Sequence, residues 1–572
     1  MKKFKRLFAL TTCAVTILTA VACGNANNDP EGSEELKDNA VVEVQLFHPG
    51  GYGREFLDKW GEEFAKTYKD KGYTISVTKA EKTIKFNYEI TTPAKNSTDL
   101  YFTSETIGVN AAIDNSIMIL KDPNRVLLED LTDSFYDSYA IGKDGVEETV
   151  KIKDKIHHEA LQYTQYYGVN EKWHGRSYLV PWVNAVNGFI FNKDLLCGRF
   201  GLEVPVTTEE MLEQFDIIRE SGTGIMPVVT AVADAYNWWD YVTNVWWAQY
   251  SGAEKWENFY KVIPEEGTTA ENGYEIYNDD GMEYAYRTLF QMFIPQNAPE
   301  HSGGWDSTFA AASSLNGEVV FFISGDWIAK QMSENFPTEG GAMTMMKTPI
   351  ISELGVKLRL DGSTSGEADA AKCEEMLRKT VRAIDAGRTN AEIISEITAD
   401  CGVTLTADKI EALRVARGIY YDLGVTLRAA IPSFSNEKGV ALLFLKFMAS
   451  DDGIEIFRKY AQAGLPFRPT REIEMEMTEM QGSSLAISGG EYAYLICEYD
   501  DFSTLRSVAG LQRFNGELSN INLICWNEAV LTAAEKEGLD VRERAIQAAK
   551  KFREYEYNWA KDNWASLISI AF

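Results

Sequence analysis

Cysteine is scarce in this sequence, and its spacing does not suit a bridge network or a metal site. Seven cysteines occur among 572 residues, and no two of them form a C-x-x-C pair. Cys13 and Cys23 lie near the start, which leaves an odd number for the rest of the chain. A disulfide framework and a cysteine zinc site are both disfavoured, and we expect buried free thiols.

Motifs that would hold a metal, a nucleotide or a nucleophile are also missing. The five histidines include no H-E-x-x-H pattern, and no serine or cysteine nucleophile motif occurs. His157-His158-Glu159 lies in a polar, lysine-rich stretch that favours a solvated pair over a metal site. Gly51-Tyr52-Gly53 precedes a helix, but Phe56 stands where a dinucleotide loop has its third glycine. We expect no metal site and no cofactor.

Basic residues are outnumbered by acidic ones. The chain has 56 Lys and Arg against 85 Asp and Glu, a formal net charge of −29. Nucleic-acid binding needs a basic surface, so it is disfavoured. The many acids leave open a carboxylate pair for glycoside hydrolysis, but no motif selects one pair.

The N-terminus is predicted to be a lipoprotein signal peptide over residues 1–22. Positive residues are followed by an apolar run from Leu7 to Ala22, too short for a membrane-spanning helix, and small residues then precede Cys23. We expect Cys23 to carry lipid; the alternative is an ordinary secretory signal with Cys23 as an unused thiol. Residues 23–40 are polar and read as a tether between the lipid and the folded body.

The rest of the chain is long enough for two or more domains and reads as α/β. A strand at 41–47, a glycine-rich turn, a helix from about Arg54 and a second strand at 75–77 form the first unit. The helix has an apolar stripe of aromatic residues spaced by four, namely Phe56, Trp60, Phe64 and Tyr68.

Further helices are predicted downstream. Thr207-Thr208-Glu209-Glu210 reads as a capping box that opens a helix with Met211, Leu212, Phe215 and Ile218 facing inward. Lys438–Ser450 and the last forty residues are helical. Residues 352–422 are charged, lack Trp and Phe, and have helical spacing through Cys373, Leu377, Val381, Ile384, Ile410, Leu413 and Ile419. This segment is predicted to be a small helical insertion.

The order of several motifs resembles the extracellular solute-binding proteins of carbohydrate importers, the group that includes maltose-binding protein. Besides the opening strand, turn and helix, the matching segments are Thr98–Tyr101, His174–Pro181, Asn187–Leu196, Pro205–Glu210, Asn316–Trp327 and Ala430–Ser450. Two departures stand out: Thr208 replaces a usual tryptophan, and residues 352–422 have no counterpart. After residue 470 the chain matches only in being helical.

This resemblance implies a two-lobed periplasmic-binding-protein-like fold (type II) with a hinge, plus the helical insertion. By analogy, the N-terminal lobe holds 41–183 and 426–470, the C-terminal lobe holds 184–351 and 471–572, and the insertion spans 352–425. Ligands of such folds lie in a cleft where loops from the strand ends meet.

A sugar presents hydroxyl groups at its edges and C–H groups on its faces, so its pocket needs flat apolar rings beside short polar side chains. Residues of these types occur in the motif loops and are predicted to bind the ligand: Tyr52, Asp99, Trp182, Asn184, Trp238, Trp239, Trp305, Asp326 and Trp327. For any single tryptophan, packing in the core is the competing interpretation.

The function that the resemblance implies is capture of a carbohydrate, an oligosaccharide in our prediction, and its delivery to an ABC permease. The predicted protein is a monomer without enzyme activity, held by its lipid at the extracellular face of the cytoplasmic membrane. Two other hypotheses stay open, a lipid-anchored glycoside hydrolase and a surface carbohydrate-binding adhesin. Product formation would favour the first, and absence of ligand-induced closure would favour the second.

Overall fold

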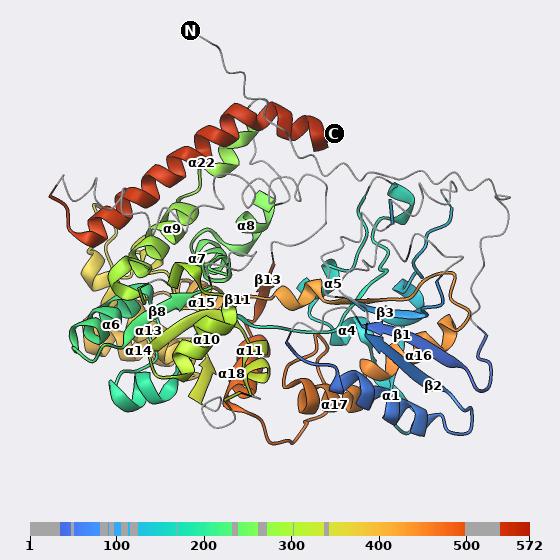
Figure 1. The fold of residues 1–572 in the computed structure, drawn as a ribbon. Helices are drawn as coiled ribbons and strands as arrows, with labels where there is room; N and C mark the ends of the chain where they lie inside the picture. Colours follow the sequence, from blue (N-terminus) through green and yellow to red (C-terminus); the bar gives the residue numbers. More distant parts are fainter. Residues whose placement is uncertain are drawn as a thin grey trace, which may run out of the picture.

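Among the described residues, two large β-sheets lie in two bodies side by side, which we call the first and second lobes (Figure 1), and a third sheet has only two strands. The computed structural model describes residues 35–46, 51–79, 90, 96–103, 113–114, 124–168, 170–231, 238–260, 272–300, 302–333, 335–336, 342–497 and 538–571. The predicted signal peptide, Cys23 and most of the tether therefore lie outside the described residues. Within the described ranges, no helix combines the length and the apolar character needed to cross a membrane.

The sheet of the first lobe has the strand order β2-β1-β3-β12-β6. The strands are β1 (Val41–Leu46), β2 (Thr74–Lys79), β3 (Leu100–Thr103), β12 (Arg428–Ala430) and β6 (Val180–Pro181). β1 is parallel to β2 and β3, whereas β12 is antiparallel to both β3 and β6. All of these strands except β12 therefore end at the same edge.

Helix α1 (Glu55–Thr67) covers this sheet as predicted. Phe56, Trp60 and Phe64 are fully buried, because a spacing of four residues keeps them on one face of the helix. Trp60 also donates from Nε1 to the carbonyl oxygen of Gly453 at 2.8 Å, which fastens α1 to α17 (Asp451–Ala461). The predicted helix at the late motif is α16 (Lys438–Met448).

The sheet of the second lobe has the order β13-β11-β7-β9-β8, with β10 also paired to β7. Its strands are β13 (Tyr494–Ile496), β11 (Ile419–Tyr421), β7 (Asn187–Asn192), β9 (Val319–Gly325), β8 (Met226–Thr230) and β10 (Met343–Met345). β8 is parallel to β9 and β11 is parallel to β13, whereas β7 is antiparallel to both β9 and β11. The carboxyl ends of β8, β9, β11 and β13 therefore share the edge where β7 begins.

Helices surround the second sheet. They include α6 (Thr208–Glu220), α7 (Asp240–Ser251), α8 (Ala253–Tyr260), α9 (Asp280–Met292), α10 (Ser307–Leu315), α11 (Trp327–Met332), α18 (Glu479–Ser488) and α22 (Val541–Ala571). α22 runs along α9 at the outer side of the lobe (Figure 1). The hydroxyl of Thr207 caps α6 by accepting from Glu210 N at 3.2 Å, while Glu210 accepts from the amide of Val206. The four predicted inward residues of α6 are buried.

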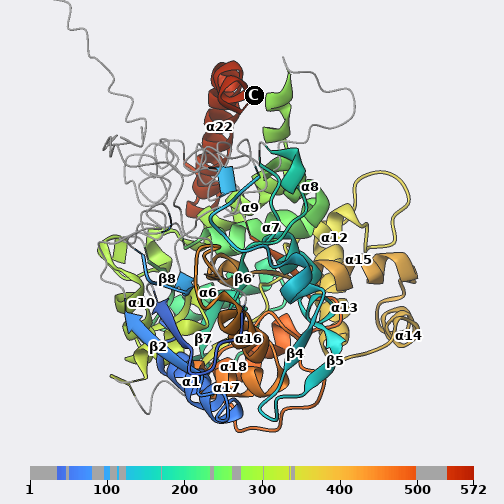
Figure 2. The ribbon, with the colours of Figure 1, turned by 90° about the vertical axis from the view of Figure 1, so that its right-hand side faces the viewer.

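The helical insertion is observed as α12 (Glu353–Lys357), α13 (Ala370–Asp385), α14 (Asn390–Cys401) and α15 (Ala407–Gly418), grouped at one side of the molecule (Figure 2). Arg378 fixes α13 to α6 with two bonds to Glu213, of 2.7 and 2.8 Å. One helical expectation is wrong: Ile419 starts strand β11, because it pairs with Tyr494 of β13. β11 thus belongs to the second sheet although it falls inside the predicted insertion, and the predicted lobe boundaries remain predictions.

Shorter elements complete the described chain. They are β4 (Tyr139–Ile141), β5 (Glu147–Lys151), α4 (Ile152–Lys155), α5 (His158–Gln162), π-helical turns at Thr132–Tyr136 and Asp194–Arg199, and 3-10 turns at Glu171–Trp173, Gly273–Tyr277, Pro295–Asn297, Ser302–Gly304 and Leu423–Thr426.

The chain passes between the lobes at residues 182–186, 422–427 and 462–478. The first passage joins the end of β6 to the start of β7, and the second joins the end of β11 to the start of β12. The third joins α17 to α18. Both sheets therefore turn the carboxyl ends of their parallel strands toward the junction, the place where α/β proteins bind their ligands.

Candidate functional site

Four of the predicted ligand residues meet at the junction between the lobes. Tyr52 follows β1, and its ring meets Trp182 edge-on at 6.4 Å and Trp327 edge-on at 6.3 Å between centroids. Trp327 in turn lies 5.6 Å from Trp238. We call Tyr52, Trp182, Trp238 and Trp327 the junction aromatics. Tyr52 comes from the first lobe and Trp182 from the first passage, whereas Trp238 precedes α7 and Trp327 begins α11 in the second lobe.

A glycine permits this close approach. Gly51 has a φ of +90°, and a Cβ built on it would lie 2.9 Å from Cδ1 of Trp327. The turn after β1 therefore touches the start of α11 directly. Any side chain at position 51 would have to push the two lobes apart or displace Trp327.

Asp326 connects the lobes by hydrogen bonds. Its Oδ1 accepts from the hydroxyl of Tyr52 at 2.9 Å, and its Oδ2 accepts from the hydroxyl of Ser484 at 2.6 Å and from Val186 N at 3.4 Å. Burial raises the pKa of Asp326 to about 6, although these donors oppose the rise. Burial and the charge of Asp326 also raise the pKa of Tyr52 well above its ordinary value. Asp326 thus holds Tyr52 in place.

Trp182 lies deeper than a ligand platform would in this conformation. Its ring is fully buried and stacks on Phe56 at 5.4 Å and 22°. Phe102 and Phe457 meet it edge-on at 5.9 and 6.4 Å. Most of the surface of the Trp182 ring is therefore packed in the core of the first lobe, as the competing interpretation predicted. Among the described residues, its indole N–H has no hydrogen-bond partner.

The structure does not bring Asp99 to the junction. Asp99 precedes β3, so it lies at the amino end of a strand whose carboxyl end faces the other lobe. Its carboxylate accepts from Glu43 N at 2.9 Å and from the hydroxyl of Ser435 at 2.5 Å. Asp99 therefore has a bracing role in the first sheet, and burial raises its pKa.

The other three predicted residues occupy different surroundings. Asn184 lies in the first passage, where its backbone N–H donates to Gly464 and its side chain accepts from Tyr420. Trp239 is buried and packs edge-on against Tyr286 of α9, inside the second lobe. Trp305 is partly buried before α10 and pairs with the exposed ring of Phe309 at 6.3 Å. The surroundings of these three residues differ because of tertiary contacts, which the local sequence does not reveal.

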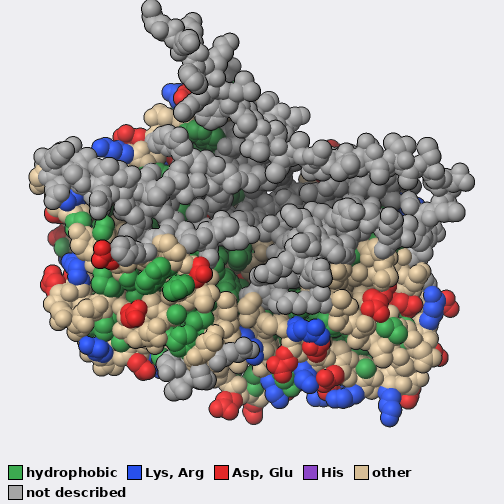
Figure 3. Space-filling view, viewed as in Figure 1, with side chains coloured by type: hydrophobic (Ala, Val, Ile, Leu, Met, Phe, Trp, Pro, Cys, Tyr) green, Lys and Arg blue, Asp and Glu red, His purple; other side chains and the backbone are tan. Residues whose placement is uncertain are grey.

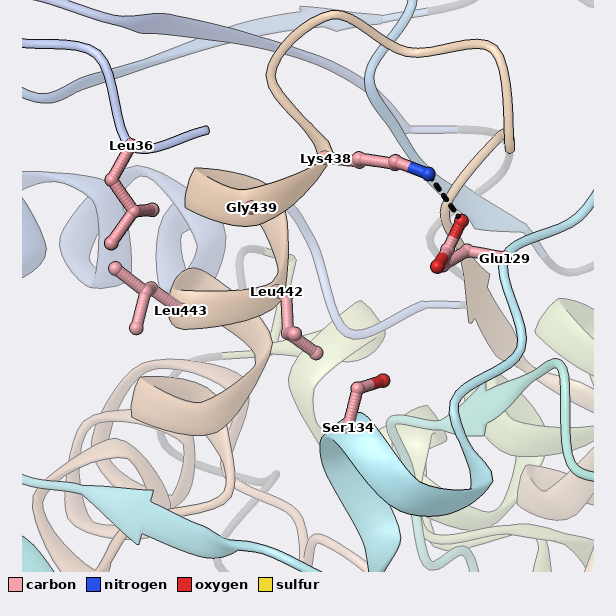
Figure 4. A pocket seen from close by; sticks show the side chains of 7 residues that line it. All are labelled: Leu36, Glu129, Ser134, Lys438, Gly439, Leu442 and Leu443. Atoms are coloured by element: carbon pink, nitrogen blue, oxygen red, sulfur yellow. Dashed lines mark hydrogen bonds and ion pairs between the residues drawn. The ribbon is translucent and has the colours of Figure 1, made fainter. Parts of the chain in front are cut away.

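Two features of the described surface lie apart from the junction. A hollow on the first lobe is lined by Leu36, Glu129, Ser134, Lys438, Gly439, Leu442 and Leu443 (Figure 4). Lys438 Nζ forms an ion pair with Glu129 Oε2 at 3.0 Å across the hollow. The two charges at its edge therefore offset each other, and the remaining lining is mostly apolar. On the face in Figure 3, described side chains of both charges are interspersed. Within the described residues, no group of three or more His, Cys, Asp and Glu is placed to hold a metal ion.

Sequence reasoning missed Gly51 and Ser484 as parts of the site. In the sequence, Gly51 stood out only as part of a possible nucleotide-binding loop. The reason for a glycine at this position is its contact with Trp327, which lies 276 positions downstream. Ser484 lies on a helix of the region that matched the family pattern only in being helical. Neither residue has a local sequence signal for its role.

Part of the chain matches a known protein family. Residues 117–355 match the family model described as bacterial extracellular solute-binding protein. The predicted resemblance to that family is confirmed over this range. No curated protein sequence matches the chain.

Solved structures share the fold. The bacterial solute receptor AcbH, described as having an exclusive preference for β-D-galactopyranose, has a TM-score of 0.53 and 12% identity, covering 90% of this chain and 100% of its own. A protein of xylan utilization by the thermophilic bacterium Caldanaerobius polysaccharolyticus has a TM-score of 0.50 and 11% identity over 90% and 100%. A chitin oligosaccharide binding protein has 0.50 and 12% over 90% and 99%. The predicted α/β, two-lobed binding-protein fold is confirmed.

Proposed function

We propose that this chain is the extracellular carbohydrate-capturing component of an ABC importer. The observation that carries the proposal is the group of junction aromatics, which both lobes supply and which Asp326 ties together through its bond to Tyr52. A ligand held there contacts both lobes at once. Such a ligand favours the closed arrangement by the difference between its affinities for the closed and open forms.

The chemistry of the junction supports a sugar. Indole and phenol rings offer flat apolar surfaces for the C–H faces of a pyranose, and their N–H and O–H groups reach its hydroxyl groups. Three of the solved structures that share the fold are named for a galactose receptor, xylan utilization and chitin oligosaccharide binding. Neutral sugars of one to several rings are therefore the ligand class that we propose.

The mechanism is binding and release without bond cleavage. The passages at residues 182–186 and 422–427 act as the hinge, since both run between the two sheets beside the junction. Closure buries the sugar, and the closed form docks on the permease, whose transport cycle opens it. No carboxylate is assigned a catalytic role, and we propose that bound sugar is released unchanged.

Anchoring belongs to the same proposal. Lipid on Cys23 and the polar tether keep a monomer at the extracellular face of the membrane, within reach of the permease. Anchoring confines diffusion to the membrane plane, so the local concentration of closed protein at the permease rises.

The decisive experiment is a calorimetric binding screen with galactose, xylo-oligosaccharides and chitin oligosaccharides, joined to small-angle X-ray scattering. We expect one sugar class to bind and to reduce the radius of gyration. Binding without compaction would contradict the closure mechanism and favour an adhesin. Cleavage products in the same samples, detected by chromatography, would contradict the assignment as a binding protein.

A further inference from the structure

Polar atoms without partners gather at the carboxyl edge of the second sheet. Within the described chain, five buried side-chain atoms at this edge have no hydrogen-bond partner: Asn187 Nδ2, Thr230 Oγ1, Trp238 Nε1, Ser324 Oγ and Asp422 Oδ2. All five side chains belong to residues that are at most 8% exposed. Native proteins leave few buried polar groups unbonded, so five at one edge call for an explanation.

Asn187 is held so that its amide nitrogen is left over. It is the first residue of β7 and lies opposite Tyr421 of β11. Its Oδ1 accepts from Leu423 N at 2.7 Å. This bond fixes the orientation of the amide, because only the oxygen can accept, and the Nδ2 donors remain without a partner among the described residues.

Asp422 is held so that one carboxylate oxygen is left over. Its Oδ1 accepts from Ala185 N at 2.9 Å and from Gly424 N at 2.6 Å. A Cβ on Gly424 would lie 2.7 Å from this oxygen and 2.7 Å from the carbonyl oxygen of Val183, so the packing around it is tight. In the ionised form, Asp422 Oδ2 is an acceptor that makes no bond within the described chain. Burial raises the pKa of this carboxyl, and a hydroxyl that donates to Oδ2 would oppose this rise by stabilising the ionised form.

The two side chains are neighbours. Asn187 is bonded to the N–H of Leu423 and Asp422 to the N–H of Gly424, so both lie against consecutive peptide groups. Their leftover atoms are a donor and an acceptor, and these atoms are not bonded to each other. A hydroxyl group both accepts and donates one hydrogen bond, so a single hydroxyl satisfies the pair.

We propose that Asn187 Nδ2 and Asp422 Oδ2 bind one hydroxyl group of the captured sugar at the floor of the junction. The proposal rests on the proposed function and adds two ligand-binding residues to it. Both atoms are shielded in this conformation, so the hydroxyl reaches them when the lobes separate. The competing occupant of such a pair is a buried water molecule, which also satisfies polar groups in protein interiors.

Two isosteric exchanges test the pair with the sugar that the wild-type chain binds best among galactose, xylo-oligosaccharides and chitin oligosaccharides. Asp422→Asn keeps the acceptor for Ala185 and Gly424 but turns the free acceptor into a donor. Asn187→Asp keeps the acceptor for Leu423 but turns the free donor into an acceptor. We expect each variant to bind about tenfold more weakly or worse. The double variant restores one donor and one acceptor in exchanged positions and should return to within about threefold of wild type.

The control is Asn192→Asp, the same exchange at the other end of β7. Asn192 donates to the carbonyl oxygen of Ser314 at 2.8 Å, inside the second lobe. This variant should melt lower while its folded fraction binds the sugar as wild type does. A variant is used for the binding comparison only if it shows a cooperative thermal melt. If Asp422→Asn does not melt cooperatively, the binding affinity of Asn187→Asp alone tests the proposed pair.

The outcomes separate the proposals. Unchanged affinity in a folded single variant identifies the occupant as water and overturns the pair, as does a double variant that is weaker than both singles. A wild-type chain that binds none of the sugars contradicts the proposed function itself. Weakened sugar binding in both single variants, together with recovered binding in the double variant, supports the proposal that Asn187 and Asp422 bind one sugar hydroxyl.

Discussion

The hydroxyl of Tyr52, in the first lobe, donates a 2.9 Å hydrogen bond to Asp326, in the second lobe. Both partners are almost fully buried, so the bond forms only when the lobes are together and its loss leaves a buried carboxylate short of a donor. This single hydrogen bond therefore stabilises the arrangement in which the two lobes are in contact.

Tyr52→Phe should shift the open–closed equilibrium of the ligand-free protein further toward the open form. The phenyl ring keeps the aromatic contacts and removes only the donor to Asp326. We expect a larger radius of gyration without sugar and a loss of stability of about 1–3 kcal/mol. The control is Tyr136→Phe, which removes a buried bond to Leu179 within the first lobe and should lower stability without opening the molecule. Equal scattering of Tyr52→Phe and wild type would argue against the link.

The carboxyl of Asp326 predicts a pH dependence of stability. Its pKa is about 6 in the folded chain, above the ordinary value, so the folded state holds the proton more tightly than the unfolded state. This contribution is fully present below about pH 4 and is lost as the pH rises through about 6, on the order of 2–3 kcal/mol in all. Burial raises the pKa of Asp422 in the same direction.

Asp326→Asn isolates this dependence. The variant cannot ionise, so its melting temperature relative to wild type should rise between pH 4 and pH 7. The charge of Asp326 also contributes to the raised pKa of Asp422, so its removal lowers that pKa and changes the difference in the same direction. A constant difference across that range would show that Asp326 does not titrate there.

Trp327 and Trp182 should respond differently to truncation. Trp327 is partly exposed at the junction, so Trp327→Ala should weaken sugar binding by about 1–3 kcal/mol with a small effect on the melt. Trp182 is fully buried against Phe56, so Trp182→Ala should cost about 3–5 kcal/mol of stability. Calorimetry on the folded fractions separates the effects, and a Trp327 variant that binds normally would remove that ring from the site.

Gly51→Ala should hinder closure. The added methyl would lie 2.9 Å from the ring of Trp327, whereas a Cβ on Gly53, also at positive φ, meets nothing within 4 Å. Gly53→Ala therefore carries the backbone strain alone and serves as the matched control. We expect Gly51→Ala to lose more sugar affinity than Gly53→Ala. Equal losses would reduce the effect to strain at positive φ.

Cys23→Ser tests the anchor. If Cys23 carries lipid, the wild-type protein should partition into the detergent phase and the variant should be shed or retain its signal peptide. Identical partitioning of the two proteins would exclude lipidation at this position.

Elements with a strong local pattern were predictable, and contacts between distant segments were not. The aromatic stripe of α1 and the cap at Thr207 follow from spacing and from one side chain, so the sequence specifies them locally. Ile419 fits a helical spacing, yet it becomes a strand because β7 and β13 offer edges on both sides of it. The spacing of apolar residues within one segment does not show which distant strands will pair with it.

The site shows the same division. Tyr52, Trp238 and Asp326 lie between elements of regular structure and Trp327 begins α11, and the structure brings these four residues together. Asp99 lies beside a strand too, but at its amino end, and nothing in its motif distinguishes the two ends. Trp182 directly follows the motif segment that ends at Pro181, and this position at the passage between the lobes does not show that the ring turns into the core.

The interleaved passages have a consequence for export. β12, which starts at Arg428, lies between β3 and β6, and β11 and β13 complete the second sheet from residues 419 onward. Neither sheet can be finished until about three quarters of the chain has emerged. A nascent chain that starts with a secretory signal must stay unfolded to thread through a narrow translocation channel. Late completion of both sheets delays stable folding of the early segments. If residues 1–22 act as the predicted secretory signal, this delay keeps the precursor in a form that can be translocated.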